Sequence, residues 1–278
     1  MFLSHATDAP EYRPGFAPRP GVSHVLFDFD GTLSWLRHGW PAIMAGLFLE
    51  HHPIRSGESP AVLHQELLEE LLSLNGKPSI FQMERFAERL RARGETPPSP
   101  ADLLAEYSRR LDEQIRERSA RVTAGTAARD EYVIHGARQL LDQLRDAGCK
   151  LMILSGTREE RVREEAALLG LADYFGGHIY GSPAEPSRFT KRAVMDRLLA
   201  EEGITGAQLL SFGDGPVEIE QTKALGGLAV AVASHEEVNG GGRMDAAKRR
   251  QLLAAGADVV IADYRDPETL LAALLRSA

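Results

Sequence analysis

Two carboxylates stand two residues apart in the segment Asp28-Phe29-Asp30-Gly31-Thr32, which directly follows an apolar run at residues 25–27. Alternate residues of a strand point to the same side, so both carboxylates emerge together where Gly31 and Thr32 turn the chain. Two acids held this close repel each other unless a cation or a shared proton offsets the repulsion. The segment therefore suits a Mg²⁺-assisted nucleophile with a neighbouring acid or base, although its five residues alone are also compatible with a strand end closed by turn-forming residues.

Three further chemistry-bearing features follow in order along the chain. Ser155 comes directly after an apolar run at 151–154, Lys191 opens a helical pattern, and Asp214 lies in a Gly-Asp-Gly loop after a run at 209–212. Each feature alone is common, as turn chemistry, as a solvated lysine or as a loop. The ordered set is more specific than its members, because the interval between Lys191 and Asp214 accommodates one helix and one strand.

Short apolar runs predict the strands that position these residues, at 25–29, 151–154, 178–180, 209–212, 228–232 and 259–261. From the second run onward, helical patterns that stop at a glycine separate the runs. Helices ended by glycine and followed by short apolar strands are the signature of repeated βα units. We therefore predict an α/β fold with a Rossmann-like parallel sheet flanked by helices on both faces.

The stretch at 34–133 shows helical patterns only and is far longer than a crossover between parallel strands requires. We predict an all-α cap domain at 34–133, inserted into a catalytic core made of 23–33 and 134–278. Such an insertion would lie over the carboxyl ends of the strands, where open α/β proteins bind ligands. Residues 1–22 contain several prolines and no apolar segment, and we expect a flexible N-terminal arm there.

Composition bounds the partners of the chain. Its 278 residues carry a formal net charge of −8, which argues against a nucleic-acid binder but leaves a small anionic substrate open. Cys149 is the single cysteine, so no intrachain disulfide is possible and a reducing compartment is expected. No apolar run approaches the roughly 18 residues of a membrane span, and no secretory signal is evident. We therefore expect a cytoplasmic protein that acts on a small molecule.

With Asp28-x-Asp30, Ser155, Lys191 and the loop at 213–218 in this order, the chain resembles phosphohydrolases of the haloacid dehalogenase superfamily. The resemblance covers about 23–33 and 134–262, together with the position of the helical insert. It implies that Asp28 is a nucleophile that forms an aspartyl-phosphate, and that Asp30 protonates the leaving alkoxide and then activates water. Dehalogenase-like members lack this second acid, so Asp30 points to a phosphatase or a phosphomutase.

The resemblance also implies the ligands of a metal ion. Asp28 and Asp214 would coordinate Mg²⁺ together with the backbone carbonyl of Asp30, and such oxygen ligands are what Mg²⁺ prefers. Glu218 stands where aspartate is more usual, and its longer side chain would reach the metal directly or through a water.

The same resemblance assigns the phosphate-binding groups. The hydroxyl of Ser155 and the N–H of Gly156 would bind phosphate oxygens. Lys191 would neutralise charge on the nucleophile and the phosphoryl group, because electrostatic stabilisation dominates phosphoryl transfer.

Candidate substrate contacts from the helical insert are Lys77, Arg37 and Trp40, which lie in a turn between two helices and in the segment leading into the insert. For each of them a packing or solvated role is the alternative. We expect Lys248, by contrast, to lie on a solvated helix face.

These observations predict a Mg²⁺-dependent phosphatase for a small phosphorylated metabolite, most similar to the phosphoglycolate phosphatase-like branch, with a sugar phosphate as an equal substrate class. One alternative is a phosphomutase resembling β-phosphoglucomutase, which would transfer the phosphoryl group to a sugar. The other is a non-catalytic phosphate-binding module that kept the fold.

Overall fold

The computed structural model describes residues 7–74, 78–183 and 190–276. In this part of the chain a seven-stranded sheet has the strand order β1-β7-β6-β5-β2-β3-β4, in which β1 is antiparallel to β7 and all other neighbours are parallel. The strands are β1 (Glu11–Tyr12), β2 (His24–Phe27), β3 (Lys150–Arg158), β4 (Ile179–Ser182), β5 (Leu209–Gly213), β6 (Leu228–Val232) and β7 (Val259–Ile261). The predicted α/β class with a mostly parallel sheet is confirmed.

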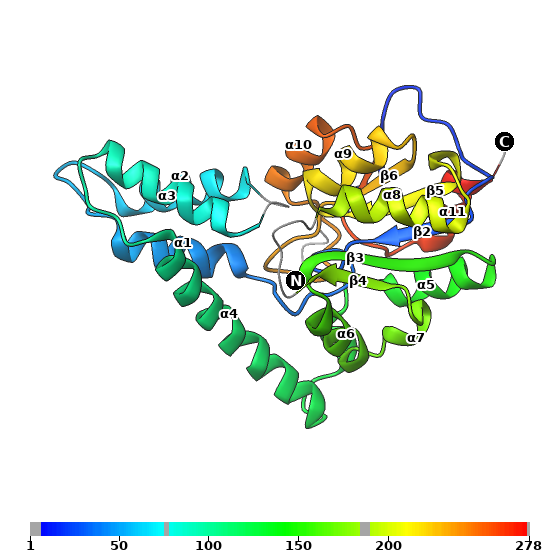
Figure 1. Ribbon diagram of the computed structural model, residues 1–278, viewed down its shortest axis with the longest axis horizontal. Coiled ribbons are helices and arrows are strands. Elements are labelled where there is room, and N and C mark those ends of the chain that lie inside the picture. The colour runs from blue at the N-terminus through cyan, green and yellow to red at the C-terminus, as the bar shows by residue number, and fades with distance from the viewer. Residues whose placement is uncertain (1–6, 75–77, 184–189, 277–278) are drawn as a thin grey trace, which may run out of the picture.

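Both faces of the sheet are buried, which explains why the strands read as continuous apolar runs. Val25 and Phe27 contribute to a core cluster with α5 (Ala137–Asp146), α6 (Glu159–Leu168) and α11 (Pro267–Leu275). Leu26, between them, packs on the opposite face. That face is covered by α8 (Lys191–Glu202), α9 (Pro216–Ala224) and α10 (Ala246–Ala254). Figure 1 shows the sheet between these two helical layers.

Between β2 and α5, the described part of the chain forms four α-helices that extend to one side of the sheet (Figure 1). They are α1 (Trp40–His51), α2 (Pro60–Leu72), α3 (Ile80–Ala92) and α4 (Pro100–Thr123). Their apolar stripes, including Leu63, Leu67 and Leu71 of α2, meet in a cluster separate from the cores on the sheet. The insert therefore builds an apolar core of its own.

Short elements complete the described chain. They are the single-turn helix α7 (Ala172–Phe175) and the 3-10 turns η1 (Arg129–Tyr132) and η3 (Gly206–Gln208). Among the described residues, no helix combines the length and the apolar character needed to cross a membrane.

The two segments that join the insert to the sheet run side by side. Ser34 forms an antiparallel bridge with Val133, and the N–H of Trp35 donates to the carbonyl of Tyr132 over 2.8 Å. The N–H of Ile134 in turn donates to the carbonyl of Leu33. The outgoing and returning segments are therefore held as a pair.

Two local features differ from the sequence-based expectation. Residues 11 and 12, expected in a flexible arm, form the edge strand β1, and the Arg249 guanidinium pairs with the Glu11 carboxylate over 2.6 Å. This pairing depends on a partner far along the chain, so the local composition of the arm did not indicate it. Strand β3 also continues through Ser155 to Arg158, with a register shift between Leu154 and Arg158 that loosens its pairing with β4.

Candidate active site

Adjacent parallel strands bring the predicted site residues to one edge of the sheet. Strand β2 lies between β3 and β5, and Phe27 is in register with Ile153 on one side and Phe212 on the other. Because the three strands run in the same direction, the residues after these positions emerge together. The structure therefore brings Asp28, Ser155 and Asp214 to one site, although they lie far apart in the sequence.

Asp28 is held between backbone and ammonium contacts. Its N–H donates to the carbonyl of Phe212 over 2.9 Å, which keeps the chain in line with β5. The Lys191 ammonium donates to Asp28 Oδ1 over 2.8 Å and also contacts Glu218 Oε1. Lys191 is the first residue of α8, whose start is fixed by the Thr190 hydroxyl accepting from Ala193 N over 3.1 Å.

Burial dominates the electrostatics of this cluster. The side chains of Asp28, Lys191 and Glu218 are each only 9–10% exposed. Burial raises the pKa of Asp28, the Lys191 ammonium opposes that rise, and the carboxylates of Glu218 and Asp214 add to it. Burial lowers the pKa of Lys191, but Asp28 and Glu218 outweigh it and raise the pKa overall, so Lys191 remains a cation. The Lys191 ammonium is therefore the shared partner of two buried acids, Asp28 and Glu218.

Asp214 lies against the turn that follows Asp30. Gly31 has a φ of +74°, and a Cβ atom there would sit 2.2 Å from Asp214 Oδ2. The close approach of the two loops therefore requires glycine at position 31, both for backbone conformation and for space. Lys248 donates to Asp214 Oδ2 over 3.0 Å, and burial raises the pKa of Asp214 while this ammonium lowers it.

Both carboxylate oxygens of Asp30 accept hydrogen bonds. Arg37 donates to its Oδ1 over 2.5 Å, and the Thr157 hydroxyl donates to its Oδ2 over 2.8 Å. Arg37 also makes a bidentate pair with Glu165 of α6 over 2.5 and 2.7 Å. Burial raises the pKa of Glu165 to about 6, with Arg37 opposing the shift. Arg37 thus links the predicted acid to α6, a helix that packs on the sheet.

Thr157 connects Ser155 and Gly156 to Asp30, because its hydroxyl donates to the Asp30 carboxylate. The Ser155 hydroxyl is buried and accepts from Thr157 N over 3.0 Å, whereas Gly156 is exposed. The Ser155 hydroxyl and the Gly156 N–H lie where β3 shifts its register against β4. Such donors are suited to an oxyanion.

The donor chemistry at this edge fits Mg²⁺. Asp28, Asp214 and Glu218 supply buried carboxylates, and Glu218 Oε2 is buried without a hydrogen-bond partner among the described residues. A buried oxygen of this kind favours a cation or an ordered water. Lys191 pairs with Asp28, and Lys248 pairs with Asp214. Within the described ranges, no three acidic, histidine or cysteine side chains lie together as they would around a metal.

The three candidate residues of the insert differ in their relation to the site. Arg37 reaches Asp30, as described above. Trp40 begins α1 and packs partly buried against the core of the insert. Lys77 lies outside the described residues.

Four site neighbours were not identified from the sequence. Lys248 is 2% exposed and pairs with Asp214, so the expectation of a solvated helix face was wrong for it. Thr157, Glu165 and Glu236 were likewise not assigned a role. Only Thr157 carried a local signal, its place next to Ser155; the others meet the site through tertiary contacts that no spacing in the sequence indicates.

Comparisons with known proteins show the family and the fold of the chain. A family model described as a haloacid dehalogenase-like hydrolase matches residues 22–226. A phosphoglycolate phosphatase of Synechococcus elongatus is 25% identical over 210 residues, which are 75% of this chain and 82% of that protein.

Solved structures show the same fold. A haloacid dehalogenase-like protein of unknown function from Agrobacterium tumefaciens matches with a TM-score of 0.64 at 19% identity, over 91% of this chain and 98% of that one. A predicted phosphoglycolate phosphatase from Haemophilus somnus matches with a TM-score of 0.59 at 14% identity, over 90% and 98%.

Proposed function

Because the chain belongs to the haloacid dehalogenase-like hydrolase family, we propose that it is a Mg²⁺-dependent phosphatase that works through an aspartyl-phosphate on Asp28. The predicted enzyme class, a phosphoric monoester hydrolase, is confirmed by the family and by the curated phosphatase relative. The observation that carries the mechanistic proposal is the buried contact between Asp28 and Lys191 at the edge where Ser155 and Asp214 also lie. A carboxylate nucleophile beside a cation suits attack on phosphorus.

The proposed reaction has two steps. In the first, a carboxylate oxygen of Asp28 bonds to phosphorus, the bond from phosphorus to the leaving oxygen breaks, and the Asp30 carboxyl gives that oxygen its proton. In the second, water attacks phosphorus and gives a proton to Asp30, and the bond to Asp28 breaks to release inorganic phosphate. Lys191 stays beside the nucleophile throughout, and Ser155 and Gly156 would hold the phosphoryl oxygens.

The metal site would be built from the same acids. Asp28, Asp214 and the backbone carbonyl of Asp30 would hold Mg²⁺, with Glu218 as a direct or water-mediated ligand. When bound, Mg²⁺ would supply positive charge that offsets the repulsion between the nucleophile and the phosphoryl group. The orphaned oxygen of Glu218 supports this proposal.

The helical insert would select the substrate. We propose that 34–133 is a cap domain over a core of 23–33 and 134–278, and that Arg37, Trp40 and Lys77 are its candidate contacts to the leaving group. A cap of this kind excludes water and reads the part of the ester that leaves. The proposed substrates are small phosphate esters of the phosphoglycolate or sugar phosphate type.

The test is phosphate release from a panel of phosphorylated metabolites, with Mg²⁺ or with EDTA. Wild type and Asp28→Asn are compared, and the products are also analysed for isomers. We expect metal-dependent release that is lost in Asp28→Asn. Release that persists in EDTA would contradict the metal requirement, and an isomer in place of inorganic phosphate would indicate a phosphomutase.

A further inference from the structure

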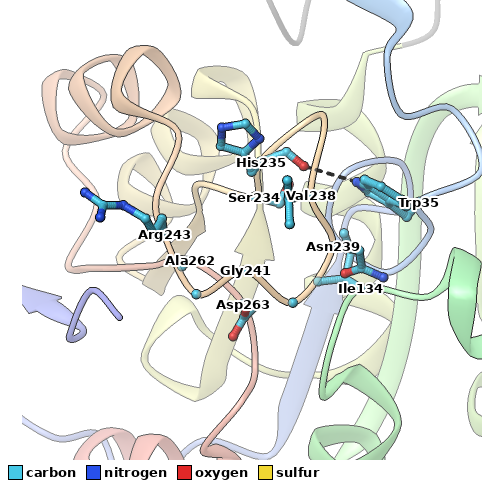
Figure 2. Close-up of a pocket in the computed structure, with 12 residues that line it drawn as sticks. Trp35, Ile134, Ser234, His235, Val238, Asn239, Gly241, Arg243, Ala262 and Asp263 are labelled. Carbon is cyan, nitrogen blue, oxygen red and sulfur yellow. Dashed lines mark hydrogen bonds between the residues drawn. The ribbon is translucent and has the colours of Figure 1, made fainter. Parts of the chain in front are cut away.

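The loop between β6 and α10 contacts both segments that join the helical insert to the sheet. The Trp35 indole N–H donates to the carbonyl of His235 over 3.2 Å, and Figure 2 shows the indole directed at this oxygen. On the returning segment, the Asn239 amide donates to the carbonyl of Val133 over 2.7 Å and accepts from the N–H of His135 over 3.0 Å. We call residues 234–239 the linker clamp, because they hold the outgoing and the returning segment.

The linker clamp also contacts the active-site side of the sheet. Its first residue, Ser234, donates to the carbonyl of Gly31 over 2.7 Å, in the turn after Asp30. One of its two carboxylates, Glu236, accepts from the N–H of Gly39 over 3.1 Å, and Gly39 is the residue that precedes α1. Because Gly39 is the N-cap residue of α1, its hydrogen bond to Glu236 positions the start of this helix.

Lys248 joins the linker clamp to Asp214. Its ammonium lies 2.6 Å from Glu236 Oε1, 3.0 Å from Asp214 Oδ2 and 3.4 Å from the Ser234 hydroxyl. The side chain is 2% exposed. The first turn of α10, from which it projects, is fixed by the Asp245 carboxylate accepting from the N–H groups of Ala247 and Lys248.

The charges make this arrangement costly to break. Lys248 is one buried cation between two carboxylates, and removing it leaves both acids without this ammonium partner. Removing one partner of a buried ion pair strongly destabilises the folded protein, because the remaining charge is buried without compensation. The buried Lys248 ammonium therefore depends on both acids. Through Glu236 it links the position of Asp214 to that of Gly39.

We propose that Lys248 is a positioning residue for the hydrolysis reaction: it holds the Asp214 carboxylate and, through Glu236, ties it to the start of the helical insert. The inference rests on the proposed role of Asp214 in the phosphatase. In this arrangement, the orientation of Asp214 depends on the linker being seated on the clamp. Lys248 and Glu236 are predicted to affect turnover without contacting the reacting atoms.

The experiment compares Glu236→Gln, Lys248→Met and the double variant with wild type. Arg250→Gln, an exposed position on the same helix, is the matched control. Steady-state hydrolysis of p-nitrophenyl phosphate with saturating Mg²⁺ gives kcat and KM, and thermal unfolding gives stability. Tryptophan fluorescence reports the linker directly, because Trp35 and Trp40 are the two tryptophans of the chain.

We expect Glu236→Gln to shift the tryptophan emission and to lower kcat about 10- to 100-fold with KM changed less than about threefold. The double variant removes one positive and one negative charge, so it should regain much of the stability lost in Lys248→Met. Its kcat should stay low, because Asp214 still lacks the Lys248 ammonium. Arg250→Gln should leave the tryptophan emission, kcat and stability unchanged.

A double variant that regains wild-type kcat along with stability would show that the pair is structural only and would overturn the proposal. A folded Glu236→Gln with wild-type emission and kcat would do so as well. If wild type itself releases no phosphate, the proposed function fails, but the emission shift still tests whether Glu236 holds the linker.

Discussion

The Lys191 ammonium donates to the carboxylate of Asp28 over 2.8 Å, although 163 positions separate the two residues in the chain. Both side chains are about nine-tenths buried, so solvent and salt screen the pair weakly. The contact joins the end of β2 to the start of α8 and fixes the orientation of the predicted nucleophile.

Asp28→Asn should abolish phosphate release, by more than about 10³-fold, because an amide cannot form the aspartyl-phosphate. Asp258→Asn is the matched control: Asp258 is equally buried, at 9% exposure, and pairs with Lys223 over 2.7 Å beside β7. The control should lower the unfolding temperature but keep kcat. Equal activity of the two variants in a phosphate-release assay would remove Asp28 as the nucleophile.

Asp30→Asn should slow hydrolysis most for poor leaving groups, because the proton that Asp30 supplies matters little when the leaving oxygen is already stable as an anion. The measurement compares kcat/KM for an aryl phosphate and an alkyl phosphate in wild type and variant. We expect a loss about tenfold or more larger for the alkyl ester. Equal losses for both esters would contradict the acid role.

Gly31→Ala should destabilise the protein and impair hydrolysis together. A Cβ atom at position 31 would overlap Asp214 Oδ2, and the φ of +74° strains any other L-residue by roughly 1–2 kcal/mol. Gly94→Ala isolates the second effect, because Gly94 has a φ of +78° and open space around its Cβ position. Chemical unfolding and phosphate release would be measured on both. A Gly31→Ala enzyme as active and stable as Gly94→Ala would mean that Asp214 is not tightly placed.

Glu165 should make stability depend on pH. Its folded-state pKa is raised to about 6 from 4.5, mainly by burial, so the folded chain binds this proton more tightly than the unfolded chain. The stabilisation is present below about pH 4.5 and is lost as the pH rises toward 6, by an amount on the order of 2 kcal/mol.

Glu165→Gln should therefore show a flatter stability curve than wild type between pH 4 and 6.5. The exposed neighbour Glu164→Gln provides the control and should keep the wild-type slope. Urea unfolding at a series of pH values gives the free energies. Parallel curves for wild type and Glu165→Gln would show that Glu165 does not titrate in this window.

Local patterns in the sequence predicted six of the seven strands of the described sheet and most of the helices between them, but not the edge strand β1. Strand β6 was predicted at its observed limits and β7 likewise, because short apolar runs bounded by glycine-terminated helices have few other solutions. The start of α8 at Lys191 also agreed with prediction. Since parallel strands share one direction, this order of elements already implied that Asp28 and Asp214 meet at one edge.

Tertiary structure decided which charged side chains are buried and which partners they find. Lys248 reads as part of a basic, solvated helix face, yet it is enclosed by Asp214 and Glu236. Arg37 lies at the start of the insert in sequence, yet its guanidinium pairs with both Asp30 and Glu165 of α6. The periodicity of a sequence records which face of an element is apolar, whereas an ion pair between distant segments depends on where the folded chain brings them together.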